Sequence, residues 1–135
     1  MKTTTLTEDM LVHCVTASSF PEGVRQAHET LHALVPNVDR RNYFGLSRRD
    51  EKGIILYKAG VTALDKGELD RFQLETICLA KGDYLYIDVP DFMKNRPGIG
   101  QAFEQLIADE RMAADGFCIE WYLSLGLCRC MVRMK

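Results

Sequence analysis

An internal repeat constrains the fold of this 135-residue chain more than any other feature. A shift of 75 residues places GVRQAHETLHA (23–33) on GIGQAFEQLIA (98–108), with Gly, Gln, Ala, Glu, Leu and Ala identical. A duplicated sequence indicates a duplicated supersecondary unit that buries its apolar face against its neighbour. If the two units join about a pseudo-twofold axis, positions related by the shift face each other across that axis.

The hydrophobic pattern predicts the same order of elements in both halves. Helical spacing covers 21–35 and 98–111, and a proline lies near the first turn of the earlier helix, where its missing N–H costs nothing. Strand-like runs cover 10–17, 42–48, 54–61, 74–79, 83–89, 117–125 and 127–134. We therefore expect one domain over 1–135, with strand-helix-strand-strand repeats at about 10–61 and 83–134 and a flexible N-terminus at 1–9.

Composition and charge exclude several functional classes. Hydrophobic residues make up 47% and charged residues 27%, the balance of a globular domain with one core. The net charge of −2 leaves no basic surplus to neutralise phosphates, so no nucleic-acid partner is expected for this chain by itself. No apolar stretch is long enough to span a bilayer, and the start of the chain does not resemble a signal peptide. Five cysteines without C-x-x-C spacing favour reduced thiols, so we expect a cytoplasmic protein with no membrane partner.

The segment His28-Glu29-Thr30-Leu31-His32 has the H-E-x-x-H pattern of zinc proteases. In the repeat, however, His28 corresponds to Phe103 and His32 to Ile107, so the sister helix has large apolar side chains at both positions. A third ligand at suitable spacing is also missing. We therefore interpret the two histidines as packing residues, and we expect no metal, no cofactor and no zinc protease activity.

Two strand motifs near the C-terminus carry polar or reactive groups. Cys128 and Cys130 lie on one face of a strand together with apolar residues, which favours a role in the core. Glu120 shares a strand face with Tyr122 and corresponds to Gly45 in the repeat. The residues leave two interpretations of Glu120 open: a carboxylate in a cavity at the axis, or a solvated carboxylate paired with Arg129 or Arg133 on the neighbouring strand.

Aromatic residues gather on the same short segments. Tyrosine and tryptophan rings pack on flat apolar ligands, and their π-faces attract cations. A single carboxylate among such rings adds selectivity for positive charge, and desolvation raises its pKa. The aromatic residues concerned are Tyr43, Phe44, Tyr57, Tyr84, Tyr86, Trp121 and Tyr122.

The chain resembles the GyrI-like small-molecule-binding domains, which are related to the effector-binding domains of multidrug-responsive bacterial regulators. The resemblance extends from Met10 to Met134 and rests on the duplicated plan and on three motifs. These motifs are Tyr43-Phe44-Gly45-Leu46-Ser47, Ala80-Lys81-Gly82-Asp83-Tyr84 and Ile119-Glu120-Trp121-Tyr122-Leu123. Because no helix-turn-helix or coiled-coil segment precedes Met10, a stand-alone member is expected.

This resemblance implies an α+β fold, in which duplicated β-α-β-β units form an antiparallel sheet with two helices on one side. It also implies a pocket at the pseudo-twofold axis for small lipophilic compounds, including cationic or planar ones. Glu120 would be its central carboxylate, and the 75-residue shift makes Gly45 the open position across the axis. The segment 91–97, which includes Phe92, departs from the family pattern, and we expect it to lie over the pocket as a lid. The walls would be formed by Tyr43, Tyr57, Trp121 and Tyr122.

Some free-standing relatives look like hydrolases that open strained rings, so the alternative function is hydrolysis of a reactive electrophile with Glu120 as general base. A third alternative is a protein that binds a larger partner. The expected partner is a small molecule, and the sequence leaves open whether the chain forms a homodimer.

Overall fold

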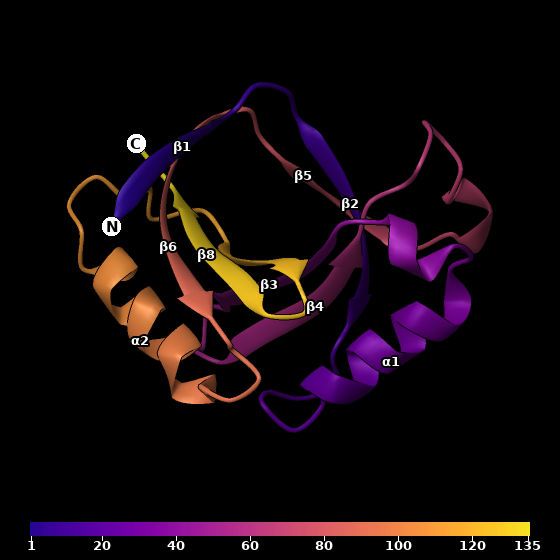
Figure 1. Cartoon of the computed structure of the whole chain (residues 1–135), viewed down its shortest axis with the longest axis horizontal. Helices are drawn as coiled ribbons and strands as arrows, with labels where there is room; N and C mark the ends of the chain where they lie inside the picture. Colours follow the sequence, from indigo (N-terminus) through magenta and orange to yellow (C-terminus); the bar gives the residue numbers. More distant parts are fainter.

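The computed structural model describes residues 1–135 and contains one antiparallel sheet and two helices. The strands follow the order β1-β6-β8-β7-β3-β4-β2-β5 across the sheet, which curls in Figure 1. The strands are β1 (Lys2–Leu6), β2 (Met10–Thr16), β3 (Tyr43–Arg49), β4 (Ile55–Val61), β5 (Glu75–Leu79), β6 (Gly82–Pro90), β7 (Cys118–Ser124) and β8 (Leu127–Arg133); the helices are α1 (Val24–Leu34) and α2 (Arg96–Ile107). The α+β fold predicted from the sequence is confirmed. Neither helix has the length and apolar character needed to cross a membrane.

The pseudo-twofold axis passes between the two central strands. β3 and β7 pair antiparallel, and Gly45 lies directly opposite Glu120. These two residues are also related by the 75-residue shift, so they are equivalent positions that meet at the axis. The duplication seen in the sequence is therefore a symmetry of the sheet.

The first strand was not expected. Residues 1–9 were predicted to be flexible, and that prediction is wrong for Lys2–Leu6, which pairs antiparallel with β6 along its whole length. β5 pairs with β2 at the opposite edge of the sheet. The strand that precedes each repeat, β1 before the first and β5 before the second, therefore pairs with the other repeat in space. The threonine run of β1 favours extended structure, but this exposed edge strand lacks the apolar alternation that reveals a half-buried one.

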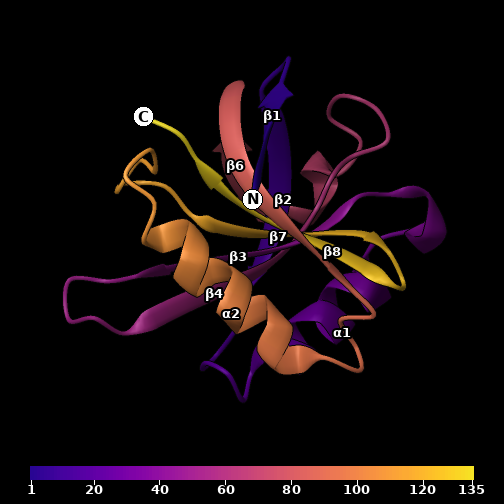
Figure 2. The same ribbon diagram turned by 60° about the vertical axis from the view of Figure 1, so that its left-hand side comes forward.

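Both helices pack on the same face of the sheet (Figures 1 and 2). α1 lies against β2 and β4, and α2 lies against β6 and β8. Ala27 and Leu31 of α1 are buried, as are their repeat equivalents Ala102 and Leu106 of α2. Burying a leucine side chain stabilises the fold by about 1.5–3 kcal/mol. The central strands β3 and β7 remain uncovered between the helices, and the opposite face of the sheet encloses a separate apolar core.

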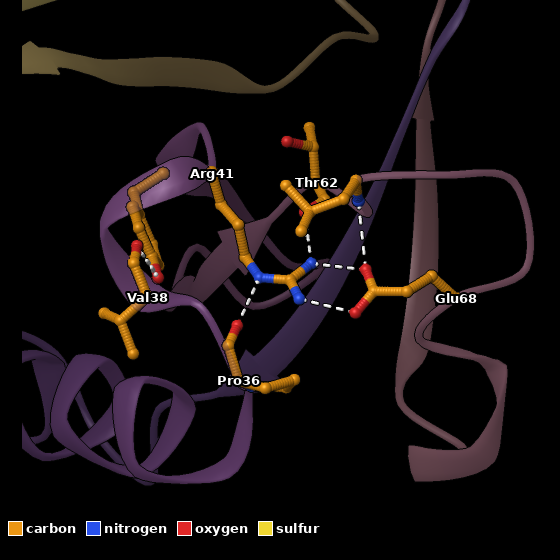
Figure 3. A network of polar contacts seen from close by, with 7 residues as sticks. Pro36, Val38, Arg41, Thr62 and Glu68 are labelled. Atoms are coloured by element: carbon orange, nitrogen blue, oxygen red, sulfur yellow. Dashed lines mark hydrogen bonds and ion pairs between the residues drawn. The ribbon is translucent and has the colours of Figure 1, made fainter.

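A buried arginine joins the loops at the end of α1 and after β4 (Figure 3). Arg41 donates two hydrogen bonds of 2.6 Å to the carboxylate of Glu68, and its other N–H groups reach the carbonyl oxygens of Pro36 and Thr62. Glu68 also accepts a hydrogen bond from the backbone N–H of Leu64. The hydrogen bonds from Arg41 lower the pKa of Glu68 to about 2.

This ion pair predicts a specific loss of stability in acid. A carboxylate with a lowered pKa contributes stability that is fully present above its unfolded-state pKa of about 4.5 and is lost as the pH falls towards 2. We expect Glu68→Gln to unfold at lower urea concentration than wild type above pH 5, and the two proteins to converge near pH 2. Glu22→Gln, which alters an exposed carboxylate outside every ion pair, serves as the control. A difference between Glu68→Gln and wild type that stays constant from pH 6 to pH 2 would contradict this role.

Candidate functional site

A broad cleft runs between α1 and α2 above the central strands β3 and β7. Its volume is about 2660 Å³, larger than the roughly 300–1,000 Å³ of pockets for drug-sized ligands, so one such ligand would fill only part of it. We call it the interhelical cleft. Its apolar and aromatic lining includes Phe20, Val24, Tyr43, Tyr57, Phe92, Ile99, Phe103, Ile107, Phe117 and Tyr122.

Glu120 lies on the floor of the interhelical cleft. β7 positions it on the helix-bearing face of the sheet together with Tyr122, because alternate side chains of a strand share a face. The hydroxyl of Tyr122 donates a hydrogen bond of 2.6 Å to Glu120 Oε1. Glu120 is half-buried, and it forms no ion pair. Of the two interpretations of this residue, the structure supports the carboxylate in a cavity.

The alternative pairing of Glu120 with Arg129 or Arg133 is wrong. Arg129 lies on the opposite face of the sheet, where it pairs with Asp88 at 2.8 Å and stacks on Tyr86. Arg133 is exposed at the end of β8 and forms no ion pair. No arginine therefore neutralises the carboxylate of Glu120.

Two further residues extend the contact between Glu120 and Tyr122 into a chain. The hydroxyls of Tyr57 and Tyr122 are 3.1 Å apart, and His28 Nε2 lies 2.8 Å from the Tyr57 hydroxyl. We call these four residues the polar chain, in the order of their contacts: His28, Tyr57, Tyr122 and Glu120. The polar chain crosses the pseudo-twofold axis from α1 to β7. Both tyrosine rings also contact the His28 ring edge-on, at centroid distances of 5.8 and 5.5 Å.

Burial sets the protonation of these groups. Desolvation raises the pKa of Glu120 to about 7, and the hydrogen bond from Tyr122 opposes that rise only in part. Desolvation also lowers the pKa of His28 to about 4, with a smaller contribution from His32. The pKa values of Tyr57 and Tyr122 are raised, first by burial and then by the charge of Glu120. At neutral pH the site thus contains neutral His28, two protonated tyrosines and a carboxyl close to its midpoint.

Gly45 provides the space that the polar chain occupies. A Cβ atom at this position would overlap the hydroxyl and Cζ of Tyr57 and would lie 3.1 Å from the Tyr122 hydroxyl. Gly45 itself does not line the interhelical cleft, so its expected role as a ligand contact is replaced by a steric one. The missing side chain allows two hydroxyls to meet beside the carboxylate.

Gly45→Ala should therefore disrupt the site. We expect a loss of about 1–3 kcal/mol in the free energy of unfolding, because the buried Tyr57 ring must move to admit the methyl group. Gly100→Ala is the matched control, since a Cβ there meets no atom within 4 Å and alanine favours a helix over glycine. Urea unfolding measures both variants, and equal stability of Gly45→Ala and wild type would show that the hydroxyls do not need this space.

The structure brings two further expected wall residues and the expected lid residue Phe92 to the interhelical cleft. Tyr43, Tyr57 and Phe92 line it with Tyr122. Tyr43 donates a hydrogen bond of 2.8 Å to the carbonyl of Val38, and the Tyr122 and Phe92 rings lie 5.5 Å apart. Phe92 belongs to a turn before α2, and the expected lid over 91–97 is divided, since Arg96 and Pro97 already form the start of that helix. Whether this turn closes over a ligand stays a prediction.

Trp121 is the exception among the expected wall residues. It lies on the opposite face of the sheet, where its ring packs 5.4 Å from Phe44, and it does not line the interhelical cleft. The physical reason is strand alternation, because Trp121 stands between Glu120 and Tyr122 and must point the other way. Trp121 is therefore removed from the set of candidate ligand contacts.

The H-E-x-x-H histidines have separate partners. His28 bonds to Tyr57, whereas His32 is exposed and stacks on Tyr43 with ring centroids 4.3 Å apart. No group of three or more His, Cys, Asp or Glu side chains is placed to hold a metal ion. The interpretation of His28 as a packing residue is incomplete, because it is also the first member of the polar chain. Its position at the edge of the apolar helix face, where the equivalent residue is Phe103, was the available signal.

Three thiols lie on the same sheet face as Glu120. Cys128 and Cys130 are fully buried in the core beneath α2, as predicted, and Cys118 is half-buried and lines the interhelical cleft. Burial raises the pKa of Cys118, and the charge of Glu120 adds to that rise. Cys118 is therefore a protonated thiol, and it makes the α2 side of the floor weakly polar.

Solved structures share this fold across almost the whole chain. An integron cassette protein from the mobile metagenome of Vibrio cholerae has a TM-score of 0.69 and 10% identity, covering 99% of this chain and 95% of its own. SAV2435, solved bound to tetraphenylphosphonium, has a TM-score of 0.64 and 14% identity, with 99% and 93% covered. A protein of Staphylococcus aureus MU50, provisionally assigned to bacterial transcription regulation, has a TM-score of 0.61 and 15% identity, with 99% and 97% covered.

These similarities concern the fold, and they are consistent with a GyrI-like fold. No protein-family model matches the sequence, and no curated protein matches it either. Membership of the GyrI-like family therefore stays a prediction from the sequence motifs.

Proposed function

We propose that this chain is a stand-alone GyrI-like module that binds small lipophilic cations in the interhelical cleft, with Glu120 as the charged anchor. The observation that carries the proposal is a carboxylate on the floor of an aromatic cleft with no cationic side chain paired to it. A carboxylate in such surroundings strongly attracts a cation that also leaves water on binding, because the Coulomb interaction between the two charges is less screened there than in water. The aromatic walls add cation–π attraction and apolar contact.

The fold similarity supports the same class of ligand. SAV2435 was solved with tetraphenylphosphonium, a lipophilic cation with no hydrogen-bond donor. The volume of the interhelical cleft suits a bulky compound of this kind, and the floor of the cleft offers a negative charge and aromatic faces without a basic group. An anionic ligand would meet the uncompensated charge of Glu120.

Binding of a matched pair of compounds tests the anchor. Methyltriphenylphosphonium and neutral triphenylphosphine oxide have similar shapes and differ in charge. We expect Glu120→Gln to weaken the cation by about 1–2 kcal/mol and the neutral compound by much less, as measured by isothermal titration calorimetry. Glu104→Gln, which removes the same charge from an exposed residue of the cleft wall, should leave both affinities nearly unchanged. Equal weakening of both compounds by Glu120→Gln would refute the anchor.

The pH dependence of the same titrations follows from the raised pKa. Because the pKa of Glu120 is about 7, the carboxylate is protonated as the pH falls below that value, and its charge is lost. The affinity of wild type for the cation should decrease below pH 7 towards that of Glu120→Gln, a total loss of roughly 5–30-fold that corresponds to about 1–2 kcal/mol for the anchor, whereas Glu120→Gln should show no such decrease.

A hydrolase is the second candidate, and the same pKa favours it. A carboxylate with a pKa near 7 is a competent general base at neutral pH. In that reaction Glu120 would take a proton from water as the water oxygen attacks a carbon of a strained ring. The carbon–heteroatom bond breaks, and the heteroatom takes up the proton that Glu120 accepted, directly or through a water molecule, which returns Glu120 to the carboxylate. Styrene oxide, a small aromatic epoxide, is a suitable first substrate, with formation of the diol measured by chromatography. Diol formation that is lost in Glu120→Gln, while binding of styrene oxide itself persists, would select this function over binding alone.

A further inference from the structure

The polar chain has a defined direction. An ionised carboxylate only accepts hydrogen bonds, so the Tyr122 hydroxyl must donate its proton to Glu120 Oε1 at 2.6 Å. Tyr122 can then only accept from Tyr57, whose hydroxyl lies 3.1 Å away. Tyr57 has its proton committed in turn, so it accepts from the remaining member, His28 Nε2 at 2.8 Å. Neutral His28 must therefore carry its proton on Nε2.

The same accounting identifies the atoms that face a ligand. Glu120 Oε2 and His28 Nδ1 receive no hydrogen bond from the chain. Trp121 Nε1 is the only buried side-chain N or O atom without a hydrogen-bond partner. Because Glu120 Oε2 and His28 Nδ1 also lack a partner, they are not buried atoms, and they are accessible in the interhelical cleft. Both are acceptors in this arrangement, and both tyrosine hydroxyl protons are used within the chain. The polar chain consequently offers acceptors and no hydroxyl donor to a ligand in the cleft.

We propose that His28 is a positioning residue for Glu120: by donating to Tyr57 it completes the polar chain and supports the direction in which Tyr122 donates to Oε1, which leaves Oε2 facing a cationic ligand. This inference rests on the proposed function for its ligand, but the role of His28 in the free protein is independent of any ligand. Chained hydrogen bonds polarise one another, so loss of the first donor weakens the last bond to the carboxylate. His28 thereby favours the ionised form of Glu120 from the other side of the axis.

Few other groups act on Glu120. The titratable side chains around it are Tyr122 and Cys118 on β7, Cys128 and Cys130 on β8, Tyr57 on β4 and His28 on α1. β3 presents Gly45 opposite Glu120, and α2 presents the apolar Phe103 to the interhelical cleft. The charged side chains of the cleft walls are exposed except for half-buried Asp50 and buried Arg41, which is paired with Glu68. Burial and Tyr122 are the only causes of the shift in the Glu120 pKa. The polar chain is therefore the main polar influence on this carboxylate.

The repeat supplies well-matched variants. His28→Phe installs the residue of the equivalent position in α2, which the fold already accommodates there, and it removes the donor. His28→Gln keeps an N–H group at nearly the same reach as Nε2. His32→Ile likewise installs the equivalent residue at an exposed site outside the polar chain.

The first measurement is made on the free protein. Carbon-13 NMR of labelled glutamate side chains gives the pKa of Glu120 in each variant, with Glu120→Gln assigning the resonance. We expect His28→Phe to raise this pKa by roughly 0.5–1 unit, which corresponds to loss of one hydrogen bond in the chain. His28→Gln and His32→Ile should stay close to wild type. Nitrogen-15 NMR of wild type should show His28 as the Nε2–H tautomer at pH 7.

The second measurement uses methyltriphenylphosphonium. Its affinity for His28→Phe should be about 2–5-fold weaker than for wild type at pH 7 and should recover by pH 9, where Glu120 is ionised in both proteins. An unchanged Glu120 pKa in His28→Phe, or a His28 that carries its proton on Nδ1, would overturn the positioning role even if the cation binds. Conversely, a raised pKa without any cation binding would uphold the positioning role and refute the proposed function.

Discussion

The antiparallel contact between β3 and β7 at the pseudo-twofold axis is the constraint on which the rest of the site depends. It brings two equivalent positions of the repeat face to face, and a pair of large side chains there would compete for one space. The chain places glycine on one strand and glutamate on the other. Gly45 leaves room for the hydroxyls of Tyr57 and Tyr122, and these hydroxyls lie beside the carboxyl of Glu120. The helices cover the outer strands and leave β3 and β7 exposed, so only side chains from these two strands and from the facing sides of the helices and their neighbouring strands line the floor.

Placing a carboxylate at this position costs stability. The pKa of Glu120 is about 7 in the folded chain and about 4.5 in the unfolded chain, so the folded state binds more protons between these values. Stability from this residue therefore falls as the pH rises from about 4.5 to 7, by on the order of 3 kcal/mol. A bound cation would offset this cost, because it would stabilise the ionised form of the desolvated carboxylate. The Arg41–Glu68 pair behaves in the opposite way, because the pKa of Glu68 is lowered and its contribution is lost in acid.

The sequence predicted the features that depend on periodicity and missed those that depend on close packing. The repeat identified the axis, the facing of Gly45 and Glu120, and the two helices, because equivalent positions must serve equivalent packing. Strand alternation alone would have removed Trp121 from the pocket, but the resemblance to a family placed it in the wall. β1 was missed because an exposed, threonine-rich edge strand has no apolar face to recognise. His28 was missed as a site residue because its hydrogen bond to Tyr57 depends on the distance between α1 and β4, which no local pattern encodes.

The two units have diverged where they meet the interhelical cleft, and this divergence determines what the cleft can recognise. The polar chain takes His28 and Tyr57 from the first unit and Tyr122 and Glu120 from the second. The 75-residue shift relates three of these positions to Phe103, Ser47 and Gly45, and the strand register relates Tyr57 to Cys128. The counterpart positions therefore hold no second carboxylate and no second tyrosine pair. A fully symmetric floor would accept a ligand in two equivalent orientations, with two charges that repel each other. The polar chain across the axis instead gives the cleft one negative centre, a polar side at α1 and an apolar side at α2. The scaffold is therefore symmetric, but the site is not.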